Sequence, residues 1–235
     1  MRGLAAALLL ALVLFPSARA QQATDVAIVL AVDASSSVNL EEFGLQMQGI
    51  AAALRDPQVL STIAEGPSGS IAIALVQWSG PLQTRVAVPW RLVEGADSAE
   101  ALAKEIEETP RYFYAGSTAI GRALVYSAAV FDKLPWSAGR RVIDISGDGS
   151  NTDNPPVGPA RAEVLDRGIV INGLPILAQE PEVDRYYAEQ VIGGHGAFIE
   201  VARDYNAFTA AMTRKLVREI RTQPLISRLE QDPRP

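Results

Sequence analysis

The chain has 235 residues, no cysteine, a single histidine (His195) and a formal net charge of −6. These counts exclude a disulfide framework, a cysteine nucleophile and the zinc and copper sites that need two or three histidines from one chain. A metal ion would be held mainly by oxygen, which favours Mg²⁺, Mn²⁺ or Ca²⁺, and the acidic balance argues against a nucleic-acid partner.

Residues 1–20, MRGLAAALLLALVLFPSARA, are predicted to be a secretory signal peptide. Arg2 precedes an uninterrupted apolar run that is too short to span a bilayer, and Ala18 and Ala20 are the small residues of a cleavage site. Loss of Arg2 and Arg19 would leave a net charge of −8. Because an exported domain without cysteine is typical of bacteria, we expect a periplasmic protein with no transmembrane segment after cleavage. One domain is expected over 21–222, followed by a flexible tail over 223–235.

The rest of the sequence alternates between apolar runs of strand length and segments with helical spacing. The first helix, over 39–55, has a clear start, because Asn39 and Glu42 have the spacing of a capping box. Strands are predicted at 25–32, 70–78, 84–92, 141–146, 169–177 and 197–202. Helices are predicted at 39–55, 98–108, 118–132, 157–167, 182–192 and 205–221. A Ser-Gly-Pro turn before residue 84 indicates that the 84–92 strand is antiparallel.

This alternation predicts an α/β fold with three layers. The central sheet should be mostly parallel, with one antiparallel edge strand, and helices should cover both of its faces. In open sheets of this kind, sites form at the carboxyl ends of the strands, where the strand order reverses.

Polar residues follow two of the predicted strands at that end. Asp33, Ser35 and Ser37 follow the first strand, Asp148 lies between two glycines after the 141–146 strand, and Thr118 stands at the start of a helix. Together they would bring five hard oxygen donors and no nitrogen donor to one crevice. Two carboxylates and three hydroxyls suit Mg²⁺, with Mn²⁺ or Ca²⁺ as alternatives, and leave the ion able to take a further carboxylate from a partner.

The combination resembles the metal-ion-dependent adhesion site (MIDAS) of von Willebrand factor type A (vWA) domains. The Asp-x-Ser-x-Ser element of that family matches Asp33, Ser35 and Ser37. Its threonine matches Thr118 within GSTAIGRAL, and its later aspartate matches Asp148 within SGDGSN. The sequence over 25–221, including VDASSSVNLEEF and RRVIDISGDGSN, is similar to an uncharacterised bacterial family of exported proteins, a domain of unknown function.

The resemblance implies a Rossmann-like vWA fold and a secreted protein-binding domain that is not an enzyme and coordinates a partner's acidic side chain through the metal. Two residues depart from the family pattern. Ser36 stands where many members have glycine, and Gly147 stands where a threonine often precedes the second aspartate. Neither position is a metal ligand in the family, so the departures should affect affinity for the ion more than the ability to bind it.

Three other interpretations of these residues stay open. Ser35 or Ser37 could be the nucleophile of a hydrolase with His195, but the sequence contains no G-x-S-x-G turn. The metal could instead act as a Lewis acid in a hydrolase or transferase, but the sequence offers no good general base for it. The polar run 148–154 could be a Ca²⁺ loop, although it lacks the glycine and glutamate of an EF-hand. In a metal-free scaffold module, the hydroxyl residues would only cap helices.

Other polar and aromatic residues also carry expectations. Asp144 interrupts an apolar strand and is expected to pair with an arginine such as Arg140. The aromatic run 112–114 could line the rim of the crevice. The basic residues of the last helix are expected to face solvent: Arg214, Lys215, Arg218 and Arg221.

Overall fold

The structure is a computed structural model, and it describes residues 23–221. The expected signal peptide and tail lie outside the described residues. The strands are β1 (Ala23–Thr24), β2 (Val26–Asp33), β3 (Ile71–Trp78), β4 (Thr84–Val93), β5 (Ser137–Ala138), β6 (Arg141–Gly147) and β7 (Val170–Pro175). The α-helices are α1 (Leu40–Arg55), α2 (Pro57–Ala64), α3 (Ala96–Glu107), α4 (Ile120–Val130), α5 (Val157–Asp166), α6 (Val183–Tyr186) and α7 (Phe208–Arg221). Shorter helical turns are η1 (Phe131–Lys133), the π turn η2 (Tyr187–Val191) and η3 (Tyr205–Ala207).

The main sheet has the strand order β4-β3-β2-β6-β7. Its neighbouring strands are parallel, except that β4 pairs antiparallel with β3. This confirms the predicted mostly parallel sheet with an antiparallel edge strand. The chain begins in the middle of the sheet with β2, adds β3 and β4 on one side, and then crosses to β6 and β7 on the other, so the strand order reverses between β2 and β6.

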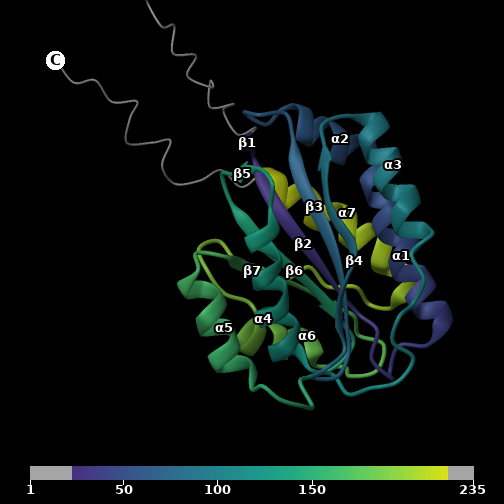
Figure 1. The fold of residues 1–235 in the computed structure, drawn as a ribbon. Coiled ribbons are helices and arrows are strands. Elements are labelled where there is room, and N and C mark those ends of the chain that lie inside the picture. The colour runs from purple at the N-terminus through teal and green to yellow at the C-terminus, as the bar shows by residue number, and fades with distance from the viewer. Residues whose placement is uncertain (1–22, 222–235) are drawn as a thin grey trace, which may run out of the picture.

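Helices cover both faces of the sheet, as predicted (Figure 1). Ile28 and Leu30 of β2 belong to the core under α1, α3 and α7, whereas Val29 and Ala31 belong to the core under α4 and α5. Because successive side chains of a strand point to opposite faces, a strand covered on both sides must be apolar throughout. That requirement explains the unbroken apolar run of β2.

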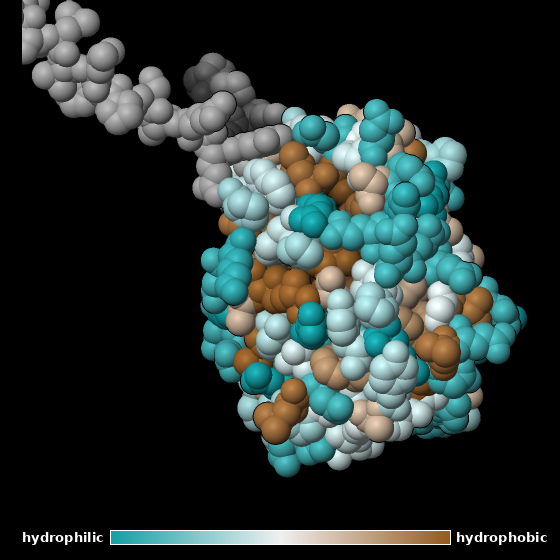
Figure 2. Space-filling model, turned by 45° about the vertical axis from the view of Figure 1, so that its right-hand side comes forward, coloured by the Kyte–Doolittle hydropathy of each residue, from teal (hydrophilic) through white to brown (hydrophobic). Residues whose placement is uncertain are grey.

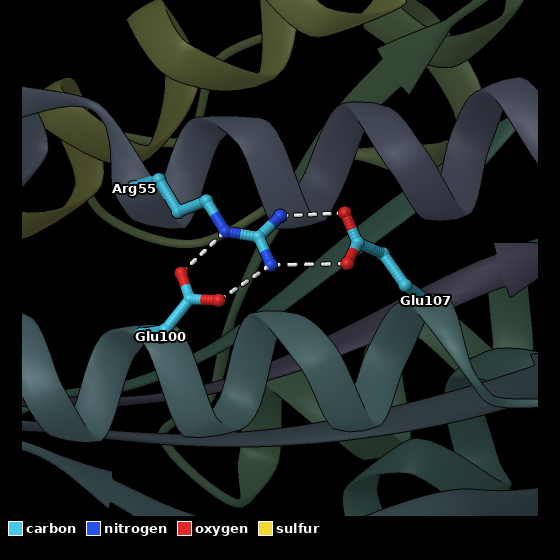
Figure 3. Close-up of polar contacts among 3 residues, drawn as sticks. All are labelled: Arg55, Glu100 and Glu107. Atoms are coloured by element: carbon cyan, nitrogen blue, oxygen red, sulfur yellow. Dashed lines mark hydrogen bonds and ion pairs between the residues drawn. The ribbon is translucent and has the colours of Figure 1, made fainter.

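The helix α1 begins next to the end of β2 and is fixed at both of its ends. At its start, Asn39 and Glu42 form the predicted capping box. At its other end, the guanidinium group of Arg55 donates two hydrogen bonds to Glu100 and two to Glu107 of α3 (Figure 3). Hydrogen bonds from Arg55 lower the pKa of both glutamates. These bonds join the end of α1 to α3.

Three local predictions were wrong. The segment 197–202 is not a continuous strand but makes two isolated parallel bridges beside β7, at Ile199 and Ala202. The expected helix over 182–192 is a short α6 that continues as the π turn η2. The helix α2 was not predicted, although Asp56 caps it and Pro57 occupies its first turn, because it follows α1 without a break in apolar spacing.

Asp144 pairs with Lys215 rather than with an arginine. The Lys215 ammonium nitrogen lies 2.7 Å from Asp144 Oδ1 and 2.6 Å from Glu219 Oε1, and all three side chains are buried. The expectation that Lys215 faces solvent is therefore wrong. The lysine bridges α7 to β6 because two acidic side chains at the same interface need a buried positive charge.

Candidate functional site

The two predicted carboxylates lie where the strand order reverses. Asp33 is the last residue of β2, and Asp148 directly follows Gly147 at the end of the adjacent strand β6. Both side chains are fully buried. Because parallel strands end at the same edge of the sheet, the fold itself sets the two acidic groups side by side.

Hydrogen bonds join four of the five predicted residues into one chain. The Ser35 amide donates to Asp33 Oδ1 at 2.7 Å, and the hydroxyl oxygens of Ser35 and Ser37 lie 3.1 Å apart. The Ser37 hydroxyl then donates to Asp148 Oδ1 at 2.7 Å. The i, i+2, i+4 spacing seen in the sequence therefore becomes a row of oxygens that runs from one carboxylate to the other.

Thr118 joins this group through the loop that carries it. Its amide donates to the Thr152 hydroxyl at 3.0 Å, and its carbonyl accepts from the Thr152 amide at 2.8 Å. Two residues earlier, the Gly116 carbonyl accepts from the Ser36 amide at 3.1 Å. The loop before α4 is thus attached to the Ser35–Ser37 loop on one side and to the loop after Asp148 on the other.

The serines and Thr118 are not helix caps. Asn39 caps α1, and Ala119 occupies the cap position of α4, which begins at Ile120 rather than at the predicted residue 118. In a metal-free module, these hydroxyls would therefore not serve as caps of α1 or α4. Ser35 is buried and Ser37 is only partly exposed, and their hydroxyls lie within the hydrogen-bonded row that leads to Asp148.

The electrostatics of the site call for a positive charge. Burial raises the pKa of Asp33 to about 7, a hydrogen bond from Ser35 lowers it in part, and the nearby Asp148 carboxylate raises it again. Asp33 Oδ2 is buried and finds no hydrogen-bond partner among the described residues. A buried carboxylate with an unused oxygen beside a second carboxylate is costly without a cation, so the donors present fit a hard divalent ion.

Within residues 23–221, there is no cluster of three or more His, Cys, Asp or Glu side chains that could hold a metal. The predicted ligand set has two carboxylates, Asp33 and Asp148, and hydrogen bonds connect both of them with Ser35 and Ser37.

Three supporting residues were not predicted from the sequence. Arg111 is buried, and its guanidinium group donates to the carbonyls of Ala34 and Ser35 at 3.1 and 3.0 Å. Gln46 of α1 donates to the Asp33 carbonyl at 3.1 Å. The Tyr205 hydroxyl donates to Asp148 Oδ2 at 3.0 Å. For Gln46 a signal exists, because an amide occupies a buried position of an amphipathic helix, but Arg111 comes from a loop and Tyr205 from η3, both far from the site in the sequence.

His195 lies far from these residues in the fold. It is exposed in a turn just after Gly193, which bonds to Ile171 near the start of β7, whereas Asp148 follows the end of β6. A serine–histidine pair at the crevice is therefore excluded. In the 148–154 run, Asn151 Oδ1 accepts from the Gly121 amide and Asp153 Oδ2 accepts from the Ser117 hydroxyl, so both side chains already bond the loop before α4 and its first turn.

Among the described residues, no helix is long and apolar enough to cross a membrane. No curated protein matches the sequence. A family model described as a protein of unknown function, DUF1194, matches residues 23–224.

Several solved structures share the fold at low identity. Proximal thread matrix protein 1 from the mussel byssus, solved with zinc in its MIDAS motif, has 15% identity and a TM-score of 0.61 over 84% of this chain and 48% of its own. The pilus adhesin SpaC from Lactobacillus rhamnosus GG has 15% identity and a TM-score of 0.62, over 86% and 31%. A von Willebrand factor type A protein from Catenulispora acidiphila has 17% identity and a TM-score of 0.57, over 84% and 43%.

This chain thus spans about half the length of the mussel protein and about a third of the adhesin. At these identities the likeness concerns the fold, and the family match covers most of the sequence. The chain belongs to the DUF1194 family, and its fold is that of a vWA domain.

Proposed function

We propose that this protein is an exported binding domain that recognises an acidic group of a partner protein through a divalent metal ion. The observation that carries the proposal is the buried, unused oxygen of Asp33, beside a chain of hydroxyls that leads to Asp148. Mg²⁺ is the preferred ion, because all five donors are hard oxygens. The MIDAS of the mussel protein, which holds zinc, supports a divalent cation at this kind of site.

Each residue has a stated role in this proposal. Asp33 and Asp148 supply the negative charge, and Ser35, Ser37 and Thr118 supply neutral oxygens that do not add to it. The backbone carbonyls of Ser35 and Asp33 are held by Arg111 and Gln46. The Asp148 carboxylate is held by the Tyr205 hydroxyl. A bound ion would supply a Lewis-acidic position for one more anionic oxygen. Rigid support of this kind keeps the donors in place before the ion arrives.

The surroundings of the site support a protein partner. Within residues 23–221, the exposed large apolar side chains are Leu40, Leu82 and Tyr114. Leu40 follows the Ser35–Ser37 loop, Tyr114 precedes Gly116, and Leu82 lies in the turn whose Gln83 donates to the Ala115 carbonyl at 2.8 Å. All three therefore lie at the carboxyl edge of the sheet, the lower end of the molecule in Figures 1 and 2, with Leu40 at the start of α1 and the other two in loops.

Exposed apolar groups at one edge favour contact with another protein. We infer that the acidic residue of the partner is flanked by apolar ones. Export to the periplasm is part of the proposal and rests on the sequence of residues 1–20.

Selection from a random peptide display library on the immobilised protein in Mg²⁺ tests this function. We expect peptides that EDTA releases and that are enriched in Asp or Glu next to apolar residues, and we expect a Glu→Gln version of a selected peptide to lose binding. The matched protein control is Asp166→Asn, an exposed carboxylate at the end of α5, which should select as the wild type does. Peptides without acidic enrichment, or retained in EDTA, would contradict the proposal.

A further inference from the structure

Two glycines on neighbouring strands form a slot for the ring of Tyr187. Gly173 of β7 pairs with Ile145, two residues before Gly147 on β6, so the two glycines face the same side of the sheet. A Cβ atom on Gly173 would lie 2.7 Å from Tyr187 Cδ1, and a Cβ atom on Gly147 would lie 2.7 Å from the Tyr187 hydroxyl oxygen. The ring therefore occupies the space that side chains at both positions would need.

The hydroxyl of Tyr187 lies beside the unused oxygen of Asp33. The same Cβ position on Gly147 would lie 2.8 Å from Asp33 Oδ2, so the two oxygens are separated by no more than these two distances together. Both groups are fully buried, and neither finds a hydrogen-bond partner in the described part of the chain. Burial raises the pKa of the Tyr187 phenol well above its ordinary value, so the hydroxyl keeps its proton. A buried donor and a buried acceptor thus lie close together, each unused.

The backbone around Tyr187 is irregular in a way that fits a special role. The expected helix over 182–192 changes from α6 to the π turn η2 at Tyr187 itself. Single π turns inside helices occur frequently at functional sites, because they cost backbone stability and alter the direction of the side chains that follow. Here the turn begins at the residue whose hydroxyl lies near Asp33 Oδ2.

We propose that Tyr187 is a positioning residue of the metal site, whose hydroxyl donates to Asp33 Oδ2, directly or through one water, and fixes the orientation of that carboxylate when the ion is bound. This inference rests on the proposed function. It also explains why residue 147 is glycine, because the side chain of a threonine there would collide with the Tyr187 hydroxyl. Tyr187 then supplies the hydroxyl that a threonine at position 147 would otherwise bring.

Calorimetric titration of the purified protein with Mg²⁺ tests the inference through Tyr187→Phe. Residues that orient metal ligands typically change affinity by 10- to 100-fold, so we expect the Mg²⁺ Kd to rise by about 10-fold or more. The metal-free protein in EDTA should be as stable as the wild type or more stable, because the change removes an unused buried hydroxyl. The matched control is Tyr186→Phe, whose hydroxyl accepts from the Asn151 amide at 3.3 Å, and which should bind Mg²⁺ within about 2-fold of wild type.

A second variant asks whether the space beside Gly147 must stay open. Gly147 does not have a positive φ, so serine is conformationally allowed there. Its Cβ atom would lie 2.7 Å from the Tyr187 hydroxyl oxygen and 2.8 Å from Asp33 Oδ2, so Gly147→Ser should weaken Mg²⁺ binding by displacing both groups.

Several results would overturn the inference. These are an unchanged Mg²⁺ Kd in Tyr187→Phe, a loss of metal-free stability that parallels the loss of affinity, or an unchanged Mg²⁺ Kd in Gly147→Ser. If the wild type binds Mg²⁺ and Tyr187→Phe binds it equally well, the proposed function stands and only the role of Tyr187 fails. If the wild type itself binds no divalent ion, both fail together.

Discussion

Asp33 should destabilise the metal-free protein, and Asp33→Asn should therefore stabilise it. The asparagine keeps the oxygen that accepts from the Ser35 amide and replaces the unused Oδ2 with an amide that can donate to the Tyr187 hydroxyl. It also removes the buried negative charge beside Asp148. The variant should lose Mg²⁺ binding at the same time, so stability and function should change in opposite directions.

The size of the effect follows from the pKa of Asp33. Burial raises it from 3.8 to about 7. Because the folded protein then holds the proton more tightly than the unfolded chain, the free energy of unfolding falls as the pH rises from about 4 through about 7. At about 1.4 kcal/mol per pKa unit, the ionised side chain costs up to about 4 kcal/mol at pH 8 and almost nothing below pH 4.

Urea denaturation in EDTA at pH 8 and at pH 4 measures this difference. We expect Asp33→Asn to exceed the wild type by about 1 to 4 kcal/mol at pH 8 and to approach it at pH 4. Saturating Mg²⁺ should stabilise only the wild type, by about 2.7 kcal/mol at 100 times the Kd. The control Asp166→Asn should follow the wild type throughout. If Asp33→Asn were less stable at pH 8, or its advantage did not depend on pH, the electrostatic reasoning would be wrong.

Three further predictions concern the supporting residues. Arg111→Met removes the donor to the Ala34 carbonyl and leaves the Ser35 carbonyl with only the Val38 amide, so the unfolding free energy should fall by about 1 to 3 kcal/mol and Mg²⁺ affinity should weaken; a change below about 0.5 kcal/mol by urea denaturation would contradict its role. Lys215→Met leaves the buried carboxylates of Asp144 and Glu219 without their shared positive charge, so the free energy of unfolding at pH 8 should fall by about 3 to 5 kcal/mol. Unchanged stability would refute the buried pairing. Leu82→Ser should leave stability and Mg²⁺ affinity intact, because the side chain is almost fully exposed, but it should weaken binding of the selected acidic peptides by about 5-fold or more; equal peptide binding would show that Leu82 does not contact the partner.

Much of the fold could be predicted because its signals are local. Strands buried on both faces must be apolar throughout, and β2 and β3 show this directly. The segment 197–202 is also mostly apolar, yet it makes only two isolated bridges, to Gly173 of β7 and to Ile176 just beyond it. Its apolar residues pack at the sheet edge without a full hydrogen-bond ladder, and composition alone does not distinguish these outcomes.

The candidate site could be predicted only in part. The spacing of Asp33, Ser35 and Ser37 became a continuous row of hydrogen bonds to Asp148, because strand ends in a parallel sheet meet at one edge. Supporting groups such as Arg111 come from loops whose position depends on tertiary contacts. No local pattern distinguishes a buried arginine that holds two carbonyls from one in solvent. In the sequence, Gly147 departs from the family pattern, but only the structure connects it with Tyr187.

Diffraction from crystals grown with Mn²⁺, recorded at the manganese absorption edge, tests the central claim most directly. The account predicts one anomalous peak at the carboxyl edge of β2 and β6, within about 2.0 to 2.6 Å of oxygens from the group Asp33, Ser35, Ser37, Thr118 and Asp148, directly or through ordered waters. The peak should be absent in crystals of Asp33→Asn. A peak elsewhere on the molecule, or an empty crevice in the wild type at saturating Mn²⁺, would contradict the account.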